Sequence, residues 1–354
     1  MISFQYRIFI LILFFVFFNC SNETKKDKKA NELRNQVLAF LLFRQTPAIA
    51  ADAFAKIYYI NPLIKATSTI NLDYVIPATS ANVTLGKKKL VFVHGWDFND
   101  RDNIAIPTTQ GLKNRAINEN WADFIKTALF DQIILTKQYD VYAFDYLTSG
   151  GIDDNGKRFR AKLDELFSNE TSTVVIHGHS MGGLVTRFAI YEGLRPVYIN
   201  RVITTGTPYH GSPWASPQFQ NEKGSLGNLA SFMTNTTGGK DLAWDNFDNK
   251  ISGASNSKLT AINAKKDRDS IFYAYYSSIT NSGTTDPGAA SPGLSLACPV
   301  LGINFSPSDC VVPQSSSTLS GNTLGLTRDM GRYDHYDIKL VIPSIQTLFY
   351  NDLP

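Results

Sequence analysis

The stretch Val174–Gly183, VVIHGHSMGG, constrains the fold of this chain more than any other feature of its sequence. A β-branched run leads into GHSMG at residues 178–182, which is a G-x-S-x-G pattern. Between a strand and a helix, this pattern makes a turn so tight that only glycine fits two residues before and after the serine. The turn strains the serine and points its hydroxyl outward. The stretch therefore predicts a strand, a sharp turn and a helix, with Ser180 at the bend and Gly178 and Gly182 required beside it.

Short apolar or β-branched runs recur along the chain from Lys88 onward, and turn residues follow each run. Segments of helical character, such as NWADFIKTALFDQI, separate several of them. The expected strands are KLVFVHGW, QYDVYAFDY, STVVIHGHS, RVITTGTP and DSIFYAYYSS. Strands that alternate with helices predict an α/β fold with a mostly parallel central sheet and helices on both faces. In such a sheet the functional residues lie at the carboxyl ends of the strands.

The N-terminal residues have the pattern of an export signal. Arg7 precedes the apolar run IFILILFFVFFN, and Cys20 follows that run. An apolar core of this length is typical of a secretory signal peptide. Because the cysteine stands directly after the core, the segment resembles a bacterial lipoprotein signal. We expect residues 1–19 to be removed, Cys20 to be lipidated and anchored in a membrane, and residues 20–35 to be a polar tether. The alternative is an uncleaved N-terminal anchor.

The rest of the chain is long and apolar enough for one large domain. The sequence has 354 residues, of which 43% are apolar and 12% aromatic. We therefore expect a single α/β domain over residues 36–354. The net charge of +3 is too weak and too scattered to favour a nucleic-acid partner.

A serine nucleophile needs a base, which in turn needs an acid to orient it. The chain has five histidines. Four of them lie in or directly after expected strands. Local packing or hydrogen bonding explains His177 and His179, His94 in HGW has the place of an oxyanion-loop residue, and His210 in GTPYHG is expected to line the site. His335, in RYDHYDIKL, is left as the base.

The acid should lie between the serine and the base in sequence, on a loop after a late strand. Asp309, in SPSDCVVPQSS, is the first candidate. Asp286, in TTDPG, is the alternative.

Five landmarks of the sequence occur in the order and with the spacing of a known family: FVHGW, GHSMGG, TTGTPYHG, SDCVVPQSS and DHYDIK. Over residues 88–348 the chain resembles bacterial secreted lipases and related esterases of the α/β-hydrolase superfamily. The resemblance implies an α/β-hydrolase fold, with Ser180 as nucleophile, Asp309 as acid and His335 as base. It also implies an oxyanion hole made by the backbone N–H groups of Met181 and Trp96.

These residues predict a serine hydrolase that cleaves carboxylic esters of lipids, either a triacylglycerol lipase or a carboxylesterase. The reaction needs no cofactor. A transacylase, a thioesterase or an amidase could use the same triad, because the nucleophile does not reveal the leaving group. A different class of protein, a non-catalytic surface lipoprotein on a hydrolase fold, is a further alternative. We expect the protein to be exported, either anchored in a bacterial membrane or secreted.

Residues 211–270 form an insertion too long for an ordinary loop. Within it, GSLGNLASFMTN has apolar residues at near-helical spacing, namely Leu226, Leu229, Phe232 and Met233. In a lipase-like enzyme a lid would lie here. An ordinary helix packed on the core explains the pattern equally well.

The resemblance also suggests structural calcium. Asp286 and Asp337 stand near positions where some secreted lipases hold calcium between carboxylates. Two aspartates are few ligands for this ion, and solvated loop charges are the alternative.

Cys298 and Cys310 are an even pair once Cys20 is committed to lipid. In an exported chain such a pair usually forms a disulfide. The alternative is two free thiols.

Overall fold

The computed structural model describes residues 54–65, 70–97, 109–117, 119–289 and 294–354. The expected signal peptide, Cys20, the tether and residues 36–53 lie outside these ranges. Within them, none of the helices is both long enough and apolar enough to cross a bilayer.

Eight strands form one sheet, in the order β2-β1-β4-β3-β5-β6-β7-β8. Strand β1 runs antiparallel to both of its neighbours, and the pairs from β4 through β8 are parallel. The strands are β1 Lys56–Ile60, β2 Val75–Pro77, β3 Lys88–Val93, β4 Tyr139–Asp145, β5 Val174–His179, β6 Ile199–Thr205, β7 Phe272–Tyr276 and β8 Leu326–Asp329. The five strands expected from sequence are confirmed as β3 to β7.

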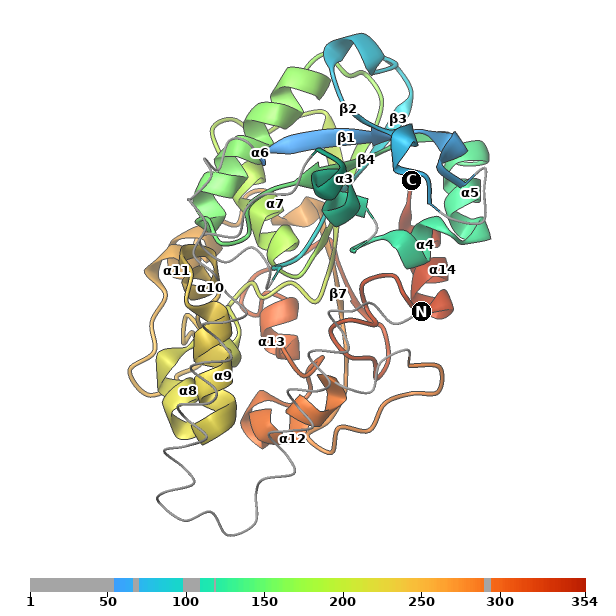
Figure 1. The fold of residues 1–354 in the computed structure, drawn as a ribbon. Coiled ribbons are helices and arrows are strands. Elements are labelled where there is room, and N and C mark those ends of the chain that lie inside the picture. The colour runs from blue at the N-terminus through green and yellow to red at the C-terminus, as the bar shows by residue number, and fades with distance from the viewer. Residues whose placement is uncertain (1–53, 66–69, 98–108, 118, 290–293) are drawn as a thin grey trace.

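Helices cover both faces of the sheet (Figure 1). Successive side chains of β3 enter different cores, with Val91 and Val93 in one and Leu90 and Phe92 in the other. The first core also takes α6 Ile152–Phe167 and α7 Met181–Tyr191. The second takes α3 Thr109–Ile117, α4 Ala122–Ile125, α5 Ala128–Leu135 and α14 Pro343–Asp352. This layered, mostly parallel sheet, with its antiparallel strand second from the edge, is the α/β-hydrolase fold.

The expected helical segment before β4 is divided in the structure. The segment NWADFIKTALFDQI forms two helices rather than one, because Thr127 caps α5 by accepting a hydrogen bond from the N–H of Phe130. Ahead of β3, residues Leu72–Tyr74 form a 3₁₀ turn before the short strand β2.

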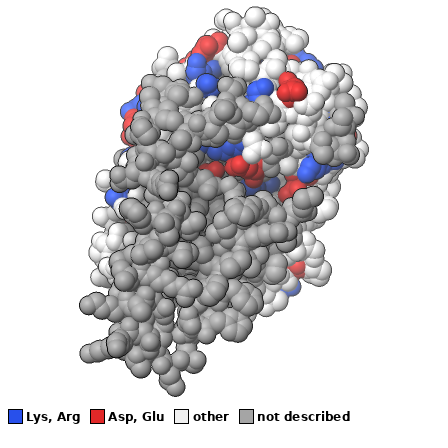
Figure 2. Space-filling model, in the orientation of Figure 1, with Lys and Arg blue, Asp and Glu red and all other residues white. Residues whose placement is uncertain are grey.

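The remaining helices lie in the connections after β6 and β7 and gather at one end of the sheet (Figure 1). Between β6 and β7 the chain forms α8 Pro217–Glu222, α9 Gly224–Thr234, α10 Thr237–Asp241 and α11 Ser257–Asn263. Between β7 and β8 it forms α12 Cys298–Leu301 and α13 Gln314–Ser317. On the visible described surface, basic and acidic side chains lie beside one another rather than in large areas of one sign (Figure 2).

Candidate active site

Ser180 lies at the bend between β5 and α7. Its φ of 53° and ψ of −127° form a backbone conformation that side chains rarely adopt. A Cβ atom on Gly178 would lie 2.8 Å from the backbone of Gly183, and one on Gly182 would lie 2.4 Å from the carbonyl oxygen of His94. Because real Cβ atoms do not approach backbone this closely, the bend requires glycine at both positions.

His335 joins Ser180 to Asp309. The imidazole Nε2 atom lies 2.8 Å from Ser180 Oγ, and Nδ1 lies 2.7 Å from Asp309 Oδ2. A carboxylate at Nδ1 favours the tautomer with the proton on that nitrogen, which leaves Nε2 able to accept a proton from the hydroxyl. The structure thus brings together the three residues that the sequence singled out as nucleophile, base and acid.

The carboxylate of Asp309 is buried, and its direction is fixed. Its Oδ1 atom accepts hydrogen bonds from the N–H groups of Val311 and Val312, at 3.0 and 2.6 Å. The N–H of His335 donates to the carbonyl oxygen of Asp309 at 3.0 Å. Since Oδ1 is held by backbone, Oδ2 is left to face the imidazole.

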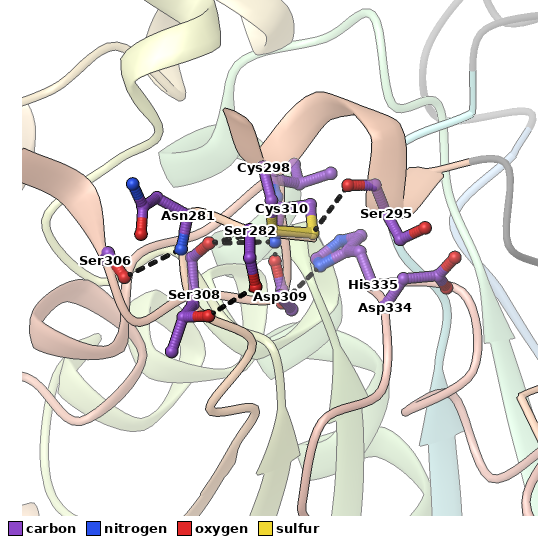
Figure 3. Close-up of a disulfide and its surroundings, with 12 residues drawn as sticks. Asn281, Ser282, Ser295, Cys298, Ser306, Ser308, Asp309, Cys310, Asp334 and His335 are labelled. Carbon is purple, nitrogen blue, oxygen red and sulfur yellow. Dashed lines mark hydrogen bonds and ion pairs between the residues drawn. A yellow bond between two sulfur atoms is a disulfide. The ribbon is translucent and has the colours of Figure 1, made fainter. Parts of the chain in front are cut away.

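A disulfide between Cys298 and Cys310 closes the loop that carries Asp309 (Figure 3). This agrees with the prediction from sequence. The N–H of Cys310 donates to Ser308 Oγ at 3.1 Å, and Trp214 Nε1 donates to the carbonyl oxygen of Cys310 at 3.0 Å. The loop of the acid is therefore tied both to its own turn and to the start of the insertion.

Gly206 is a site residue that the sequence reasoning missed. It directly follows β6 with a φ of +57°, and a Cβ atom there would lie 2.7 Å from Asp309 Oδ2 and 2.9 Å from His335 Nδ1. A side chain at this position would collide with the hydrogen bond between acid and base. The only signal in the sequence is a glycine directly after a strand in TTGTP.

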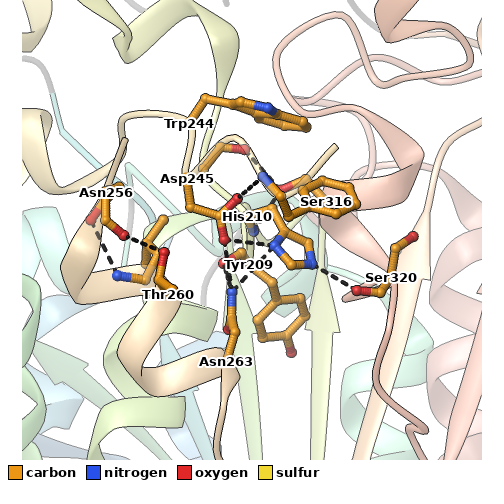
Figure 4. Close-up of polar contacts among 12 residues, drawn as sticks. Tyr209, His210, Trp244, Asp245, Asn256, Thr260, Asn263, Ser316 and Ser320 are labelled. Carbon is orange, nitrogen blue, oxygen red and sulfur yellow. Dashed lines mark hydrogen bonds and ion pairs between the residues drawn. The ribbon is translucent and has the colours of Figure 1, made fainter. Parts of the chain in front are cut away.

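His210 lies in a second polar network (Figure 4). Its Nδ1 atom lies 2.7 Å from Asp245 Oδ2, and its Nε2 atom lies 2.9 Å from the carbonyl oxygen of Ser320. Both of these partners accept hydrogen bonds and neither can donate one. This ring therefore has the contacts of a structural residue, not those of a base.

The two histidines around the nucleophile are buried. His177 lies among Trp121, Phe92 and Phe349, and burial lowers its pKa to about 3. The ring of His179 lies 4.8 Å from that of His335, and burial, followed by the charge of His335, lowers its pKa. Packing, as the sequence suggested, describes both.

The expected oxyanion donors belong to segments in contact with Ser180. Met181 is the first residue of α7, so its N–H lies at the helix N-terminus. Trp96 follows Gly95, where a Cβ atom would lie 2.9 Å from the Cβ of Ser180. The loop after β3 therefore lies directly against Ser180.

Of the two aspartates suggested for calcium, Asp286 is paired with an arginine and Asp337 is buried. The backbone N–H and then the guanidinium of Arg332 hold the pKa of Asp286 below its usual range, and the ion pair measures 2.7 Å. Asp337 is buried, and its N–H donates to Asp334 Oδ1 at 3.0 Å. Among the described residues, no three His, Cys, Asp or Glu side chains are grouped to hold a metal ion. Asp286, the alternative acid, contacts Arg332, whereas Asp309 contacts His335.

The insertion contacts the core through α10 and α11. Lys258 of α11 pairs with Asp153 at 2.6 Å, and the N–H of Gly238 of α10 donates to the carbonyl oxygen of Ser149 at 2.9 Å. Within the insertion, Lys258 pairs with Asp241 at 2.7 Å, and α9 packs against α8. The four apolar residues of α9 named from sequence are only half-buried.

A family model described as a PGAP1-like alpha/beta domain matches residues 160–237, which include the bend at Ser180. No curated protein sequence matches the chain.

Three of the solved structures that are similar to this chain are two lipases and a phospholipase. The mature lipase BlEst2 of Bacillus licheniformis is 19% identical, with 76% of this chain and 95% of that chain covered and a TM-score of 0.45. Phospholipase PlaB of Legionella pneumophila is 16% identical, over 66% and 45%, with a TM-score of 0.42. Lipase 1 of Pelosinus fermentans is 11% identical, over 75% and 97%, with a TM-score of 0.43. The assignment of the fold rests on the sheet order and the bend at Ser180 rather than on these likenesses.

Proposed function

We propose that this chain is a serine hydrolase that cleaves carboxylic esters of lipids, as a lipase or carboxylesterase, through an acyl-enzyme. The observation that carries the proposal is the pair of hydrogen bonds that links Ser180 Oγ through His335 to Asp309, 2.8 and 2.7 Å long. A strained serine, an imidazole and a buried carboxylate in this order are the parts that acyl transfer needs.

In the proposed reaction His335 Nε2 takes the proton of Ser180 while Oγ attacks the ester carbonyl carbon. The N–H groups of Met181 and Trp96 stabilise the oxyanion, and Asp309 stabilises the imidazolium. The imidazolium then gives its proton to the leaving alcohol as the ester C–O bond breaks. Water, deprotonated by His335, attacks the acyl-serine. The carboxylic acid product is released as the proton returns to Ser180 Oγ.

Apolar side chains near the insertion support a lipid substrate. Those of α9 are half-buried, and on the neighbouring disulfide segment Leu296 and Ile303 are 56% and 76% exposed. We propose that α8 and α9 form a lid whose apolar residues contact acyl chains. Substitution of Phe232 by serine should then raise the KM for long-chain esters more than that for acetate esters. Equal effects on both would remove the lid from the proposal.

The acyl acceptor separates the proposed function from its alternatives. Hydrolysis of p-nitrophenyl esters should be measured across chain lengths, with a triglyceride emulsion alongside. Preference for thioesters or amides, or transfer to an added alcohol in place of water, would favour a thioesterase, an amidase or a transacylase. No turnover of any acyl substrate would favour a non-catalytic lipoprotein.

The substitution Ser180→Ala tests the nucleophile. The bend accepts a smaller side chain, so the variant should fold, with an unfolding midpoint near that of the wild type. Ester hydrolysis should fall by about 10⁴-fold or more, because triad residues act as a unit. Full activity would refute the assignment.

We further propose that Cys20 is lipidated and anchors the enzyme. Expressed with its leader in a bacterium that processes lipoproteins, the protein should enter the detergent phase and incorporate labelled fatty acid. Cys20→Ser should abolish the label. Membrane association without any label would favour the uncleaved anchor.

A further inference from the structure

The loop after β3 is anchored through two successive carbonyl groups. Tyr146 Oη donates to the carbonyl oxygen of His94 at 2.7 Å. The His94 side chain in turn places Nδ1 2.8 Å from the carbonyl oxygen of Gly95. Because a carbonyl oxygen can only accept, Nδ1 is the donor in this contact.

The second of these hydrogen bonds bears on the oxyanion hole. The carbonyl of Gly95 and the N–H of Trp96 belong to one planar peptide unit, in which they point in opposite directions. A hydrogen bond that fixes this carbonyl therefore also fixes the direction of the Trp96 N–H. Oxyanion donors act at about 2.7–3.1 Å from the developing charge, so their direction affects the rate strongly.

A buried cluster holds the imidazole of His94 in place. The ring of Tyr146 stacks on it, with centroids 4.4 Å apart and planes at 18°. Asp145 Oδ1 lies 3.5 Å from His94 Nε2, and Arg115 Nη2 lies 2.6 Å from the same oxygen. His94 and Asp145 are 1% and 0% exposed. The ring thus lies between a carboxylate on one side and the Gly95 carbonyl on the other.

We propose that His94 is a positioning residue for the reaction: burial and the stacked ring of Tyr146 hold its imidazole so that Nδ1–H aims the Gly95–Trp96 peptide at the oxyanion. The inference rests on the proposed ester hydrolysis. The molecule then uses two histidines for different tasks. His335, oriented by Asp309, moves protons, whereas His94 fixes the direction of a backbone donor.

Two substitutions of His94 separate its nitrogens. The side-chain amide nitrogen of asparagine reaches the position of Nδ1, and that of glutamine reaches the position of Nε2. His94→Gln should lower kcat by about 10²-fold or more, the loss seen when one oxyanion donor is removed, with KM changed by less than about threefold. His94→Asn, which keeps a donor toward Gly95, should recover at least about tenfold of that loss. The affinity for a phosphonate transition-state analogue should fall in parallel with kcat/KM.

Tyr146→Phe provides a milder variant that keeps the stacked ring and removes only the hydroxyl. It should lower kcat by about tenfold without a matching rise in KM. Asp269→Asn is the matched control, because Asp269 is also a buried partner of an arginine, Arg187, but its other side-chain contacts are Tyr191 and Asn322 rather than the loop after β3. It should lower the unfolding midpoint while leaving the ratio of analogue to substrate affinity unchanged.

The inference is wrong if folded His94→Gln protein keeps the wild-type kcat, or if the asparagine and glutamine variants are equally impaired. It is also wrong if Tyr146→Phe and Asp269→Asn change kcat alike. Failure of the wild-type protein to hydrolyse any ester is a different result, because it overturns the proposed function itself and this inference with it.

Discussion

His335 and His210 are held by buried carboxylates in the same way and differ in their third partner. Asp309 and Asp245 each place Oδ2 2.7 Å from the Nδ1 atom of their histidine. At Nε2, His335 meets the hydroxyl of Ser180, whereas His210 meets a backbone carbonyl oxygen. A hydroxyl can give up a proton and a carbonyl cannot. In both cases the carboxylate orients the imidazole ring. The partner of Nε2 then determines whether the histidine can act as a base or has only a structural role.

The contacts of His210 join three segments that lie far apart in sequence (Figure 4). Asp245 belongs to the insertion, and Ser320 to the chain before β8. The N–H of His210 itself donates to Ser316 Oγ at 2.9 Å, and Phe247 stacks on its ring with centroids 3.8 Å apart. These contacts give the pair a structural task.

The largest difference between the two histidines is expected when each is replaced by alanine. His335→Ala should lower turnover by about 10⁴-fold or more with little change in stability. His210→Ala should leave turnover per folded molecule within about threefold and cost about 3–5 kcal/mol, because Asp245 stays buried without its partner. Ester hydrolysis and denaturant unfolding measure the two effects. Loss of turnover in folded His210→Ala protein would mean that the base is misassigned.

Two glycines offer a matched pair beside these histidines. Gly206 and Gly211 have φ values of +57° and +85°, and a Cβ atom on Gly211 would lie 2.2 Å from the carbonyl oxygen of Ala243. Alanine should strain either backbone by about 1–3 kcal/mol. Only Gly206→Ala should also lower kcat, by about 10- to 100-fold, because it displaces the acid and base. Equal kcat values in the two variants would remove Gly206 from the site.

Reduction of the Cys298–Cys310 disulfide is a further test of the difference between the two acids, Asp309 and Asp245. The bridge closes a loop with a sequence separation of 12 and includes Cys310, next to Asp309. Chain entropy accounts for only about 3 kcal/mol of stability. Turnover should therefore fall more than global stability on reduction and return on reoxidation. Alkylation of both cysteines in native protein without prior reduction would contradict the bridge.

The smallest effect on turnover is expected at Asp334, beside the base. Burial, and then the charge of Asp337, raises its pKa to about 7, whereas in the unfolded chain it is near 3.8. The folded state therefore holds a proton that the unfolded state loses, and stability should fall as pH rises from about 4 to about 7, by at most about 4 kcal/mol. Asp334→Asn keeps an acceptor for the N–H groups of Tyr336 and Asp337. It should remove this pH dependence without changing kcat. An unchanged pH profile of unfolding would contradict the assignment.

Local sequence patterns predicted the inner strands of the sheet better than its edge strand β8. The strands β3 to β7 are β-branched or aromatic runs, buried almost throughout in β3 to β5 and at most positions in β6 and β7, which is the signal that sequence carries best. Strand β8, Leu326–Asp329, was not predicted, because its four residues alternate between half-buried and exposed at the edge and offer no apolar run. The segment of helical character at residues 120–133 divides at Thr127, where the threonine side chain caps α5.

The candidate site was predictable where a motif carries the chemistry. Ser180 was predicted from its flanking glycines, His335 by elimination among the five histidines, and Asp309 from its place on a loop between them, and the resemblance implied the same three residues. The contacts of Gly206, and the pairing of His210 with Asp245 and of His94 with Asp145, arise between segments distant in sequence. No local pattern reports them.

Reaction with a fluorophosphonate tests the central claim most directly, because this reagent modifies only a serine that has an active base. Mass spectrometry of digests should find the label on Ser180 in the wild-type protein and, at a similar rate, in folded His210→Ala protein. The rate should fall by several orders of magnitude in His335→Ala, which lacks the imidazole 2.8 Å from Ser180 Oγ. Labelling of Ser180 at the wild-type rate without His335, or labelling of a different residue, would contradict the account.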